Sequence, residues 1–549
     1  MVLFKFNRNL FILAIIGIIL YFVANGLYGS ETEESLDVTT KPSVTMQAAS
    51  EKALDWYQAE YGIELAKADE IVYSNDKAMS TYVTKYELND LFDKDYAHIA
   101  PLDFWRVKLS TGDGSTTYVR ISMTEAKVVG WETVDSSKVY LGDLEVAQNA
   151  LQEAGFKYED FTVDKTGNGS NGHGKPTFRF TSTTDKIGKA PLVININIRD
   201  GHVLTLLPHF EPPQDFVDWL AKQDTGAGLM ATLYIAVALI LGIVSLVLVI
   251  VKRKQARFTR GILFTLVVFG AISLYSYNSL PAQAASMPVE GMEFLSPTVL
   301  LISNLIVYAI LGISLYLNAV SGDQLWRERG WNPWPRFKDA NFGQHVYSSM
   351  GRGYLLCFFI MGVQQLLFLF AYNAFDTFAI NDPSQSTFNL YWPWLFPSLA
   401  WYAGIGEEIT FRLFGIALMR KILPQGRGVS QHVYRFLAVL IPTLIWAAGH
   451  TTYAFYPNYT RLFEVAALGI IFGYVFLRYG LYTAIFAHVS MDIILMSIAN
   501  MYADHSPQGI LLGLFYIATP YLVGFIILVL HRRLRRDQPL TPVQPHAPY

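Results

Sequence analysis

Four acids and two histidines stand inside the apolar stretches of the second half of this 549-residue chain. An ionised group near the centre of a bilayer costs at least about 2.5–3.5 kcal/mol on insertion scales, so each of them needs a partner or a chemical task. Carboxylates and imidazoles can take up and release protons, which is the chemistry of general acid–base catalysis. The six residues are Glu407, Glu408, His450, Glu464, His488 and Asp492.

Helical spacing pairs some of these residues and separates others. Glu408 and Arg412 are four residues apart with the acid first, which is the favourable order for an ion pair within a helix. Glu407 is turned about 100° away from that arginine, so it suits a general base that takes a proton from water. His488 and Asp492 are also four apart and share one face of their helix.

Four of these groups come to a similar depth when each helix is counted at 1.5 Å per residue from the basic residues at its end. Glu407 lies at ~20 Å, His450 at ~22 Å, His488 at ~15 Å and Asp492 at ~21 Å. They are nearly all the ionisable side chains within the apolar stretches. The sequence therefore predicts one shared site.

Two neighbouring positions have simpler interpretations. Glu464 lies one turn from Arg461 near the end of its apolar stretch, so we expect a local ion pair rather than a catalytic group. Trp446 stands one turn before His450, where its ring can form a wall of the cavity.

Three short motifs on successive apolar stretches carry a family resemblance. The sequence EEITFR at 407–412 reads as EExxxR, WAAGH at 446–450 stands where FxxxH is expected, and HVSMD at 488–492 stands where HxxxN is expected. In this order they resemble the motifs of the CPBP (Abi) family of intramembrane glutamic proteases, relatives of the Ras-converting CAAX endopeptidase. The resemblance covers roughly residues 350–530.

The resemblance implies a mechanism for these positions. Glu407, with His450, would activate a water molecule that attacks a peptide carbonyl. His488, with the residue at position 492, would stabilise the developing oxyanion, a role that needs donors already aimed at the charge. Glu408 and Arg412 would set the geometry of the site.

The chain departs from the family pattern at two of these positions. Trp446 replaces a phenylalanine, which is an exchange between aromatic residues. Asp492 replaces an asparagine, and an ionised carboxylate cannot donate a hydrogen bond to an oxyanion. We therefore expect Asp492 to orient His488 as an acceptor, unless the carboxyl group is protonated.

Other functions for the same residues stay open. Two histidines and several carboxylates could bind zinc together with a water, although no HExxH motif is present; we predict no cofactor, with zinc as the alternative. Buried Glu–Arg and His–Asp pairs can also hold helices together in a non-catalytic membrane scaffold or a bacteriocin-immunity-type protein. A proton-coupled transporter would use such residues as a relay, but the chain has no convincing internal repeat.

Ten apolar runs are long enough to approach the ~30 Å thickness of the hydrocarbon layer. Clusters of lysine and arginine lie between the runs. If the chain crosses the membrane ten times, every cluster and both termini lie on the cytoplasmic side, as the positive-inside rule requires. No small-residue cleavage site follows the first run, so a retained anchor is favoured over a cleaved signal peptide. The runs are Leu10–Leu27, Gly228–Val251, Gly261–Leu280, Pro297–Val320, Gly353–Phe375, Trp392–Met419, Phe436–Tyr453, Leu462–Leu477, Leu481–Met501 and Ile510–Leu530.

Residues 30–226 form a predicted exported domain between the first two runs. They hold 19 basic and 32 acidic residues, against 23 basic and 13 acidic in the rest. The net charge of -3 is therefore the sum of an acidic part and a basic part. Helical spacing at Met46–Tyr61 and Leu144–Ala154 alternates with period-two patterns at Tyr118–Met123 and Val193–Ile198. This order resembles a pair of PepSY-type modules, and an α+β domain without an identifiable activity is the alternative.

The predicted fold is a polytopic α-helical membrane protein of about ten transmembrane helices, with an exported α+β domain inserted after the first helix. The single cysteine excludes a disulfide framework, and the basic residues cluster at the ends of apolar runs, which does not indicate nucleic-acid binding. We predict an intramembrane endopeptidase of the cell membrane, acting on a membrane-associated protein or peptide. The predicted parts are an anchor (1–29), the exported domain (30–226), membrane helices 2–4 with a cytoplasmic loop (227–349), a CPBP-like protease domain (350–531) and a cytoplasmic tail (532–549).

Overall fold

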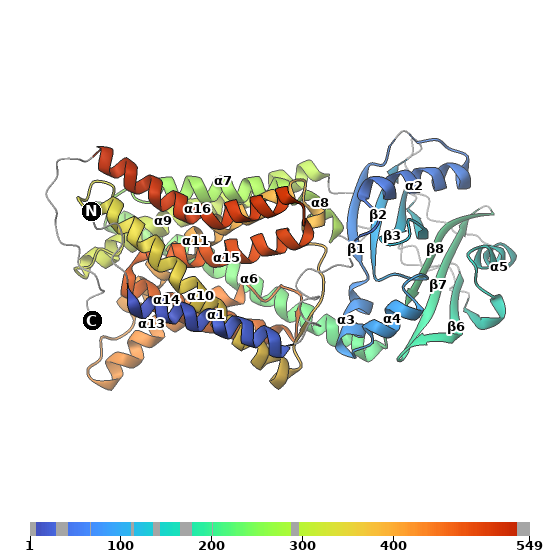
Figure 1. Cartoon of the computed structure of the whole chain (residues 1–549), viewed down its shortest axis with the longest axis horizontal. Helices are drawn as coiled ribbons and strands as arrows, with labels where there is room; N and C mark the ends of the chain where they lie inside the picture. Colours follow the sequence, from blue (N-terminus) through green and yellow to red (C-terminus); the bar gives the residue numbers. More distant parts are fainter. Residues whose placement is uncertain are drawn as a thin grey trace.

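The structure is a computed structural model that describes residues 7–28, 42–65, 67–110, 115–134, 143–164, 178–199, 201–286 and 296–534. It is elongated, with a helical bundle along most of its length and a sheet domain at one end (Figure 1). The sheet domain comprises strands β1 to β8 and helices α2 to α5, and it follows the first helix of the chain. The predicted insertion of an α+β domain after the first helix agrees with this order. The predicted tail lies almost wholly outside the described residues.

Seven helices in the described part of the chain are long and apolar enough to cross a membrane. Each falls on one of the ten predicted runs. The other three runs fall on elements that are shorter, interrupted or less apolar, so the count of ten stays a prediction. The seven helices are α1 (Arg8–Tyr28), α6 (Gln214–Val251), α9 (Pro297–Glu328), α10 (Phe342–Phe375), α14 (Asn458–Tyr479), α15 (Leu481–Ala503) and α16 (Pro507–Leu534).

The remaining helices of the bundle are shorter and include those that carry the candidate site. A single run of helix changes from α to π geometry at Glu408 and returns to α geometry at Ile416. These elements are α7 (Ile262–Asn278), α8 (Leu280–Ala285), η3 (Thr387–Asn389), η4 (Pro393–Ser398), α11 (Leu399–Glu407), the π-helix η5 (Glu408–Gly415), α12 (Ile416–Ile422) and α13 (Val429–Ala448).

The bundle is built around α15, which is the most deeply buried of the seven membrane-crossing candidates. Helix α1 packs along α10, where two glycines let the backbones meet: a Cβ atom on Gly362 would lie 2.2 Å from the carbonyl oxygen of Gly17. Only glycine permits such an approach, so α1 is an integral helix of the bundle.

The sheet is antiparallel throughout, with the order β1-β2-β3-β4-β8-β7-β6-β5. Each half holds four consecutive strands, and the halves meet where Trp131 of β4 faces Leu206 of β8. A helix precedes each half, as the period-two and helical patterns predict. The strands are β1 (Glu70–Asn75), β2 (Asp103–Ser110), β3 (Thr116–Ser122), β4 (Val128–Val134), β5 (Phe161–Asp164), β6 (Phe178–Ile187), β7 (Ala190–Arg199) and β8 (His202–Phe210).

Alternation of side chains along the strands places the apolar residues on the face that the helices cover. In the first half Trp105, Val107 and Val119 pack with the buried residues Ala49 and Ala53 of α2. In the second half the buried residues of β6, β7 and β8 pack with those of the other three helices. The helices are α2 (Met46–Tyr61), α3 (Lys77–Lys85), α4 (Asn89–Asp95) and α5 (Leu144–Glu153), with a short 3₁₀ turn η1 (Tyr158–Asp160) before β5.

Helix α6 joins the two parts without a linker. It begins at Gln214, four residues after β8, and continues for 38 residues to Val251. The predicted boundary at residue 226 falls inside this helix, and it stays a prediction. Its first turns carry Phe216 and Leu220 into the core of the sheet domain, which couples the sheet to the bundle.

The loop between α13 and α14 is held against the sheet domain and the start of α6. Its strand β10 (Phe455–Tyr456) pairs with β9 (Phe378–Ala379), and Tyr456 is buried in the sheet-domain core. Two residues further on, the backbone N–H of Asn458 donates a hydrogen bond to the side-chain oxygen of Gln223 of α6 at 3.0 Å. The loop that leads out of α13 is thus fixed at several points.

The loop between α10 and α11 is held against the edge strand β1. The side chain of Asn389 accepts from the backbone N–H of Tyr73 at 2.8 Å and donates to its carbonyl at 2.9 Å, as a neighbouring strand would. The ring of Phe388 lies edge-on to Tyr73 and Trp105. On the other side of this loop, Asn278 of α7 binds both backbone groups of Trp392.

Candidate active site

The site begins where α11 changes into the π-helix η5. Glu407 is the last residue of α11 and Glu408 is the first of η5. A π-helical turn inserts one extra residue, is rare, and is frequently found at functional sites. The change of geometry gives the two neighbouring glutamates different surroundings.

Glu408 is fully buried and has two partners. Its Oε1 lies 3.2 Å from a guanidinium nitrogen of Arg412 and 3.0 Å from Nδ1 of His488. The Glu408 side chain is 0% exposed and that of Arg412 is 1% exposed, so the predicted pair sits in a dry environment. Because a carboxylate accepts, the His488 ring carries its hydrogen on Nδ1.

Arg412 is held between aromatic rings. Its guanidinium carbon lies 4.1 Å from the centre of the Trp446 ring and 5.4 Å from that of Phe472. Cation–π contacts of this kind are stronger when they are desolvated. The arginine therefore links the Glu408 carboxylate to the aromatic wall of the site.

Glu407 points elsewhere and remains accessible. Its side chain is 15% exposed, and its Oε2 accepts a hydrogen bond from the indole N–H of Trp446. The same oxygen lies 3.9 Å from Nε2 of His488. One donor thus orients the Glu407 carboxylate, and the side chain remains partly accessible.

His450 joins the site through the backbone of α13. Its Nδ1 lies 3.0 Å from the carbonyl oxygen of Trp446, so this nitrogen donates and Nε2 is the acceptor when the ring is neutral. The ring stacks on Tyr453, with centroids 6.2 Å apart. Among the described residues no hydrogen bond or ion pair joins His450 to Glu407; the two share Trp446.

Asp492 lies on the opposite side of the His488 ring from Glu408. Its Oδ2 is 3.5 Å from Nε2 and its side chain is 16% exposed. We expect Asp492 to orient His488 as an acceptor; the ring also donates a hydrogen bond from Nδ1 to Glu408 at 3.0 Å. Asp492 and Glu407 both lie on the Nε2 side of the ring.

The structure thus brings Glu407, Glu408, Arg412, Trp446, His488 and Asp492 into one network, with His450 at its edge. Glu464 lies apart, paired with Arg461 at 2.5 Å and with Gln364 at 2.9 Å, which confirms the expected local pair. Sequence reasoning missed Phe472, whose ring stacks on His488 with centroids 4.8 Å apart. It also missed the indole N–H of Trp446 as a donor. The sequence carries no local signal for either contact, because each joins residues on different elements.

The network contains proton donors and acceptors rather than a set of metal ligands. Among the described residues no group of three or more His, Cys, Asp or Glu side chains is arranged to hold a metal ion. The arrangement can hold a proton on Glu407, and it can present the Nε2 atoms of two histidines.

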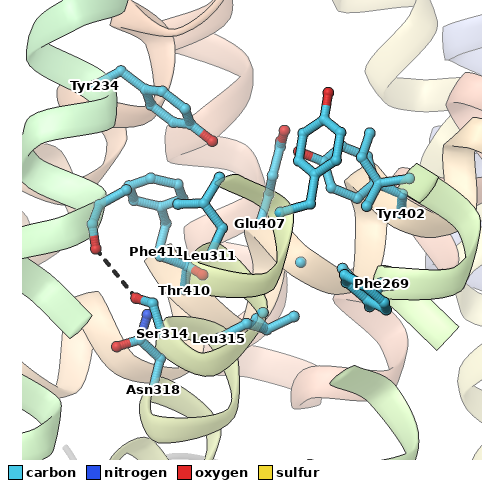
Figure 2. A pocket seen from close by; sticks show the side chains of 16 residues that line it. Tyr234, Phe269, Leu311, Ser314, Leu315, Asn318, Tyr402, Glu407, Thr410 and Phe411 are labelled. Carbon is cyan, nitrogen blue, oxygen red and sulfur yellow. Dashed lines mark hydrogen bonds between the residues drawn. The ribbon is translucent and has the colours of Figure 1, made fainter. Parts of the chain in front are cut away.

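A pocket lies beside Glu407, between α11 and three helices that precede it in the sequence. Figure 2 shows the Glu407 carboxylate and the Tyr234 hydroxyl within this pocket. The ring of Tyr234 packs on Phe411 and beneath Gly449, the residue before His450. The Glu407 side chain is therefore reached from a defined cavity.

Comparison with protein families gave one match. Residues 389–494 match the family described as type II CAAX prenyl endopeptidase Rce1-like. This Rce1-like domain spans about a fifth of the chain and contains all three motifs, which confirms the resemblance found in the sequence. The match supports a CAAX-type intramembrane protease. Searches against curated proteins and against solved structures returned no match.

Proposed function

We propose that this chain is an intramembrane endopeptidase that hydrolyses a peptide bond with a water molecule activated by Glu407. The observation that carries the proposal is the contrast between two adjacent glutamates. Glu408 is buried with Arg412 and His488, whereas Glu407 is partly exposed, oriented by Trp446 and open to a pocket. A general base needs this combination of fixed direction and access.

The reaction would proceed by general base catalysis. Glu407 takes one proton from water as the water oxygen bonds to the peptide carbonyl carbon. His450 holds the same water through Nε2, because its Nδ1 is engaged with a backbone carbonyl. When the carbon–nitrogen bond breaks, the proton held on Glu407 passes to the leaving amine, and the base is restored.

His488 would stabilise the charge that develops on the carbonyl oxygen. Glu408 holds the ring through Nδ1, so Nε2 faces the exposed side of the site. With Nδ1–H bound to Glu408, a second proton on Nε2 makes the ring an imidazolium, and this Nε2–H, 3.5 Å from Asp492, would donate to the oxyanion. Asp492 would hold that N–H in position by accepting from it. A carboxylate can play this role at the position where the family motif has an asparagine.

The substrate would be a membrane-associated protein or peptide. Glu407 is the last residue of α11, the helix that follows the loop bound to the sheet domain. We place the protein in the cell membrane with both termini cytoplasmic. The sheet domain would then face the exterior and act as a PepSY-like partner of the protease domain.

The test is cleavage of a membrane-peptide library by purified protein in proteoliposomes, with product sequencing by mass spectrometry. We expect discrete products from the wild type and none from Glu407→Gln within the same time. Glu464→Gln is a matched control, because it alters another buried glutamate of the same bundle. Activity lost with a chelator and restored by zinc would favour a metal mechanism. Equal activity in wild type and Glu407→Gln would contradict the assignment.

A further inference from the structure

Arg352 and Arg478 lie on different helices but share one aromatic ring. Arg352 belongs to α10, and Arg478 is in the last turn of α14. The guanidinium carbon of each lies 5.7 Å from the centre of the Tyr479 ring. An arginine within about 6 Å of an aromatic ring is attracted to it and can still donate hydrogen bonds. The ring therefore brings two positive charges together, although they repel each other.

Arg352 is half-buried, and it has no anionic partner in the described part of the chain. The groups that act on it electrostatically are Tyr479 and Arg478, and no described residue forms a hydrogen bond or an ion pair with Arg352 or with the Tyr479 hydroxyl. A half-buried cation beside another cation is stabilised by an anion. Three buried arginines of the same bundle each have an acid as partner: Arg260 with Asp323, Arg412 with Glu408 and Arg461 with Glu464.

Both arginines lie at the end of the bundle away from the sheet domain. Arg352 directly precedes the apolar run Gly353–Phe375, and Arg478 directly follows the run Leu462–Leu477. The other ends of α10 and α14 lead to β9 and β10, the strand pair that is held against the sheet domain. At 1.5 Å per residue the arginines lie ~30–35 Å from those ends, which matches the ~30 Å thickness of the hydrocarbon layer. Both side chains therefore reach the membrane boundary at which lipid phosphates lie.

The turn that follows α14 is fixed by the loop between α9 and α10. Gly480 has a φ of +85°, and a Cβ atom on it would lie 2.8 Å from the carbonyl oxygen of Pro333. The same carbonyl accepts a hydrogen bond from the backbone N–H of Leu481 at 3.0 Å. Only glycine permits this approach at a positive φ. The backbone of Arg478 and Tyr479 is thus held in position before a ligand binds, which lowers the entropic cost of binding.

We propose that Arg352, Arg478 and the Tyr479 hydroxyl bind the phosphate of an anionic membrane lipid. Guanidinium groups match the geometry of phosphate oxygens and donate paired hydrogen bonds to them. A lipid is favoured over free phosphate because both apolar runs meet the arginines, and because Tyr474, one turn before Arg478, is 63% exposed, so acyl chains can lie against α14. We place this end of the bundle in the cytoplasm, where the membrane surface carries anionic lipids. The site is independent of the proposed cleavage at Glu407.

The test is thermal unfolding of the purified full-length protein in a neutral detergent, with dioctanoyl phosphatidylglycerol, dioctanoyl phosphatidylcholine or inorganic phosphate added. A ligand that binds only the folded state raises the unfolding temperature, and titration gives its affinity. We expect phosphatidylglycerol to bind the wild type at least about tenfold more tightly than either of the others.

Two double variants show whether the arginines are responsible. Arg352→Gln/Arg478→Gln should weaken phosphatidylglycerol binding at least about tenfold, because it removes the charge-assisted hydrogen bonds. Arg253→Gln/Lys254→Gln is the matched control, since it removes the same charge from exposed residues just after α6, at the same end of the bundle. The control should bind as the wild type does.

Tyr479→Phe tests the site even if the arginine variant fails to fold. It keeps the ring beside both arginines and removes only the hydroxyl, so phosphatidylglycerol should bind about threefold or more weakly. Unchanged affinity in this variant would overturn the proposed set of ligand contacts. Equal affinity for inorganic phosphate would make a free anion the ligand and overturn the lipid. Equal affinity for phosphatidylcholine, or an equal loss in the two double variants, would overturn a specific site for anionic lipid.

Discussion

Glu407 and Glu408 are adjacent in the sequence, but Glu408 is buried in an ion pair and Glu407 is partly exposed. The i,i+4 spacing from Glu408 to Arg412 made that ion pair predictable from the sequence, because spacing fixes which side chains share a helix face. The contact of Glu407 with Trp446 joins residues 39 positions apart on different elements. Local spacing holds no information on such a contact, and a phenylalanine in the family motif suggests packing rather than donation.

The indole of Trp446 offers a test of how Glu407 is oriented. Trp446→Phe removes the N–H donor but keeps an aromatic ring over Arg412. A hydrogen bond to a charged group contributes about 1.5–3 kcal/mol, so kcat/KM should fall tenfold or more in a variant that thermal unfolding shows to be folded. Trp394→Phe, at an exposed tryptophan, should leave both unchanged. Full activity in Trp446→Phe would show that the indole does not position the base.

Removing one partner of the buried ion pair between Glu408 and Arg412 should destabilise the protein more than replacing both. Arg412→Met leaves the Glu408 carboxylate without its cation, which should destabilise the protein by about 3–5 kcal/mol. The double variant Glu408→Gln/Arg412→Met removes both charges and should recover more than half of that loss, without recovering cleavage. Thermal unfolding in detergent compares Glu408→Gln, Arg412→Met and the double variant with the wild type. Additive losses in the double variant would contradict a coupled pair.

Secondary structure was predictable where the pattern is long and regular. The helical spacing over Met46–Tyr61 matches α2 at both ends, and the alternating run at Val193–Ile198 lies within β7. The π-helix η5 was not predictable, because an insertion of one residue per turn has no residue-type signature. The continuity of α6 was not predictable either: the helix passes through the predicted boundary at residue 226 without a break in helical geometry.

Asp103, at the start of β2, predicts a pH dependence of stability. Burial, reinforced by repulsion from Asp93, raises the pKa of Asp103 from 3.8 to about 6, although a hydrogen bond from Tyr73 opposes the shift. The folded state then binds this proton more tightly than the unfolded state, so stability falls as the pH rises from about 4 to about 6.

Asp103→Asn removes the charge and keeps an acceptor for the Tyr73 hydroxyl. We expect the variant to exceed the wild type in stability by about 1–3 kcal/mol at pH 7.5, and to equal it near pH 4. The measurement is the free energy of unfolding of the full-length protein at both pH values. A difference of the same size at both would exclude titration of Asp103 as the cause.

At the scale of the whole molecule, the sheet domain contacts both loops that lead to the candidate site. One loop precedes α11 and is bound to β1 through Asn389; the other follows His450 and is buried in the sheet-domain core at Tyr456. The sequence predicted two parts from their charge, but not this contact, since asparagine and tyrosine in loops carry no signal of a distant partner. The domain is therefore placed to influence the site.

Asn389→Ala tests this coupling. The fully buried amide makes three hydrogen bonds, two to Tyr73 and one to Pro383, so its loss should cost about 1–3 kcal/mol locally. Hydrogen exchange should accelerate in β1 and in residues 380–398, and kcat/KM should fall. Asn373→Ala, at an exposed asparagine of α10, is the matched control. Faster exchange with unchanged cleavage would mean that the sheet domain does not act on the site.

The role of Glu407 in activating the attacking water is tested most directly by the ratio of cleavage rates between the wild type and Glu407→Gln. With a peptide that the wild type cleaves, the rate in proteoliposomes is compared for wild type, Glu407→Gln and Glu464→Gln, each checked for folding by thermal unfolding. Loss of a general base should reduce kcat about 10²–10⁴-fold in Glu407→Gln, and the Glu464→Gln rate should stay within a few-fold of the wild type. A folded Glu407→Gln protein that cleaves at the wild-type rate would contradict the account.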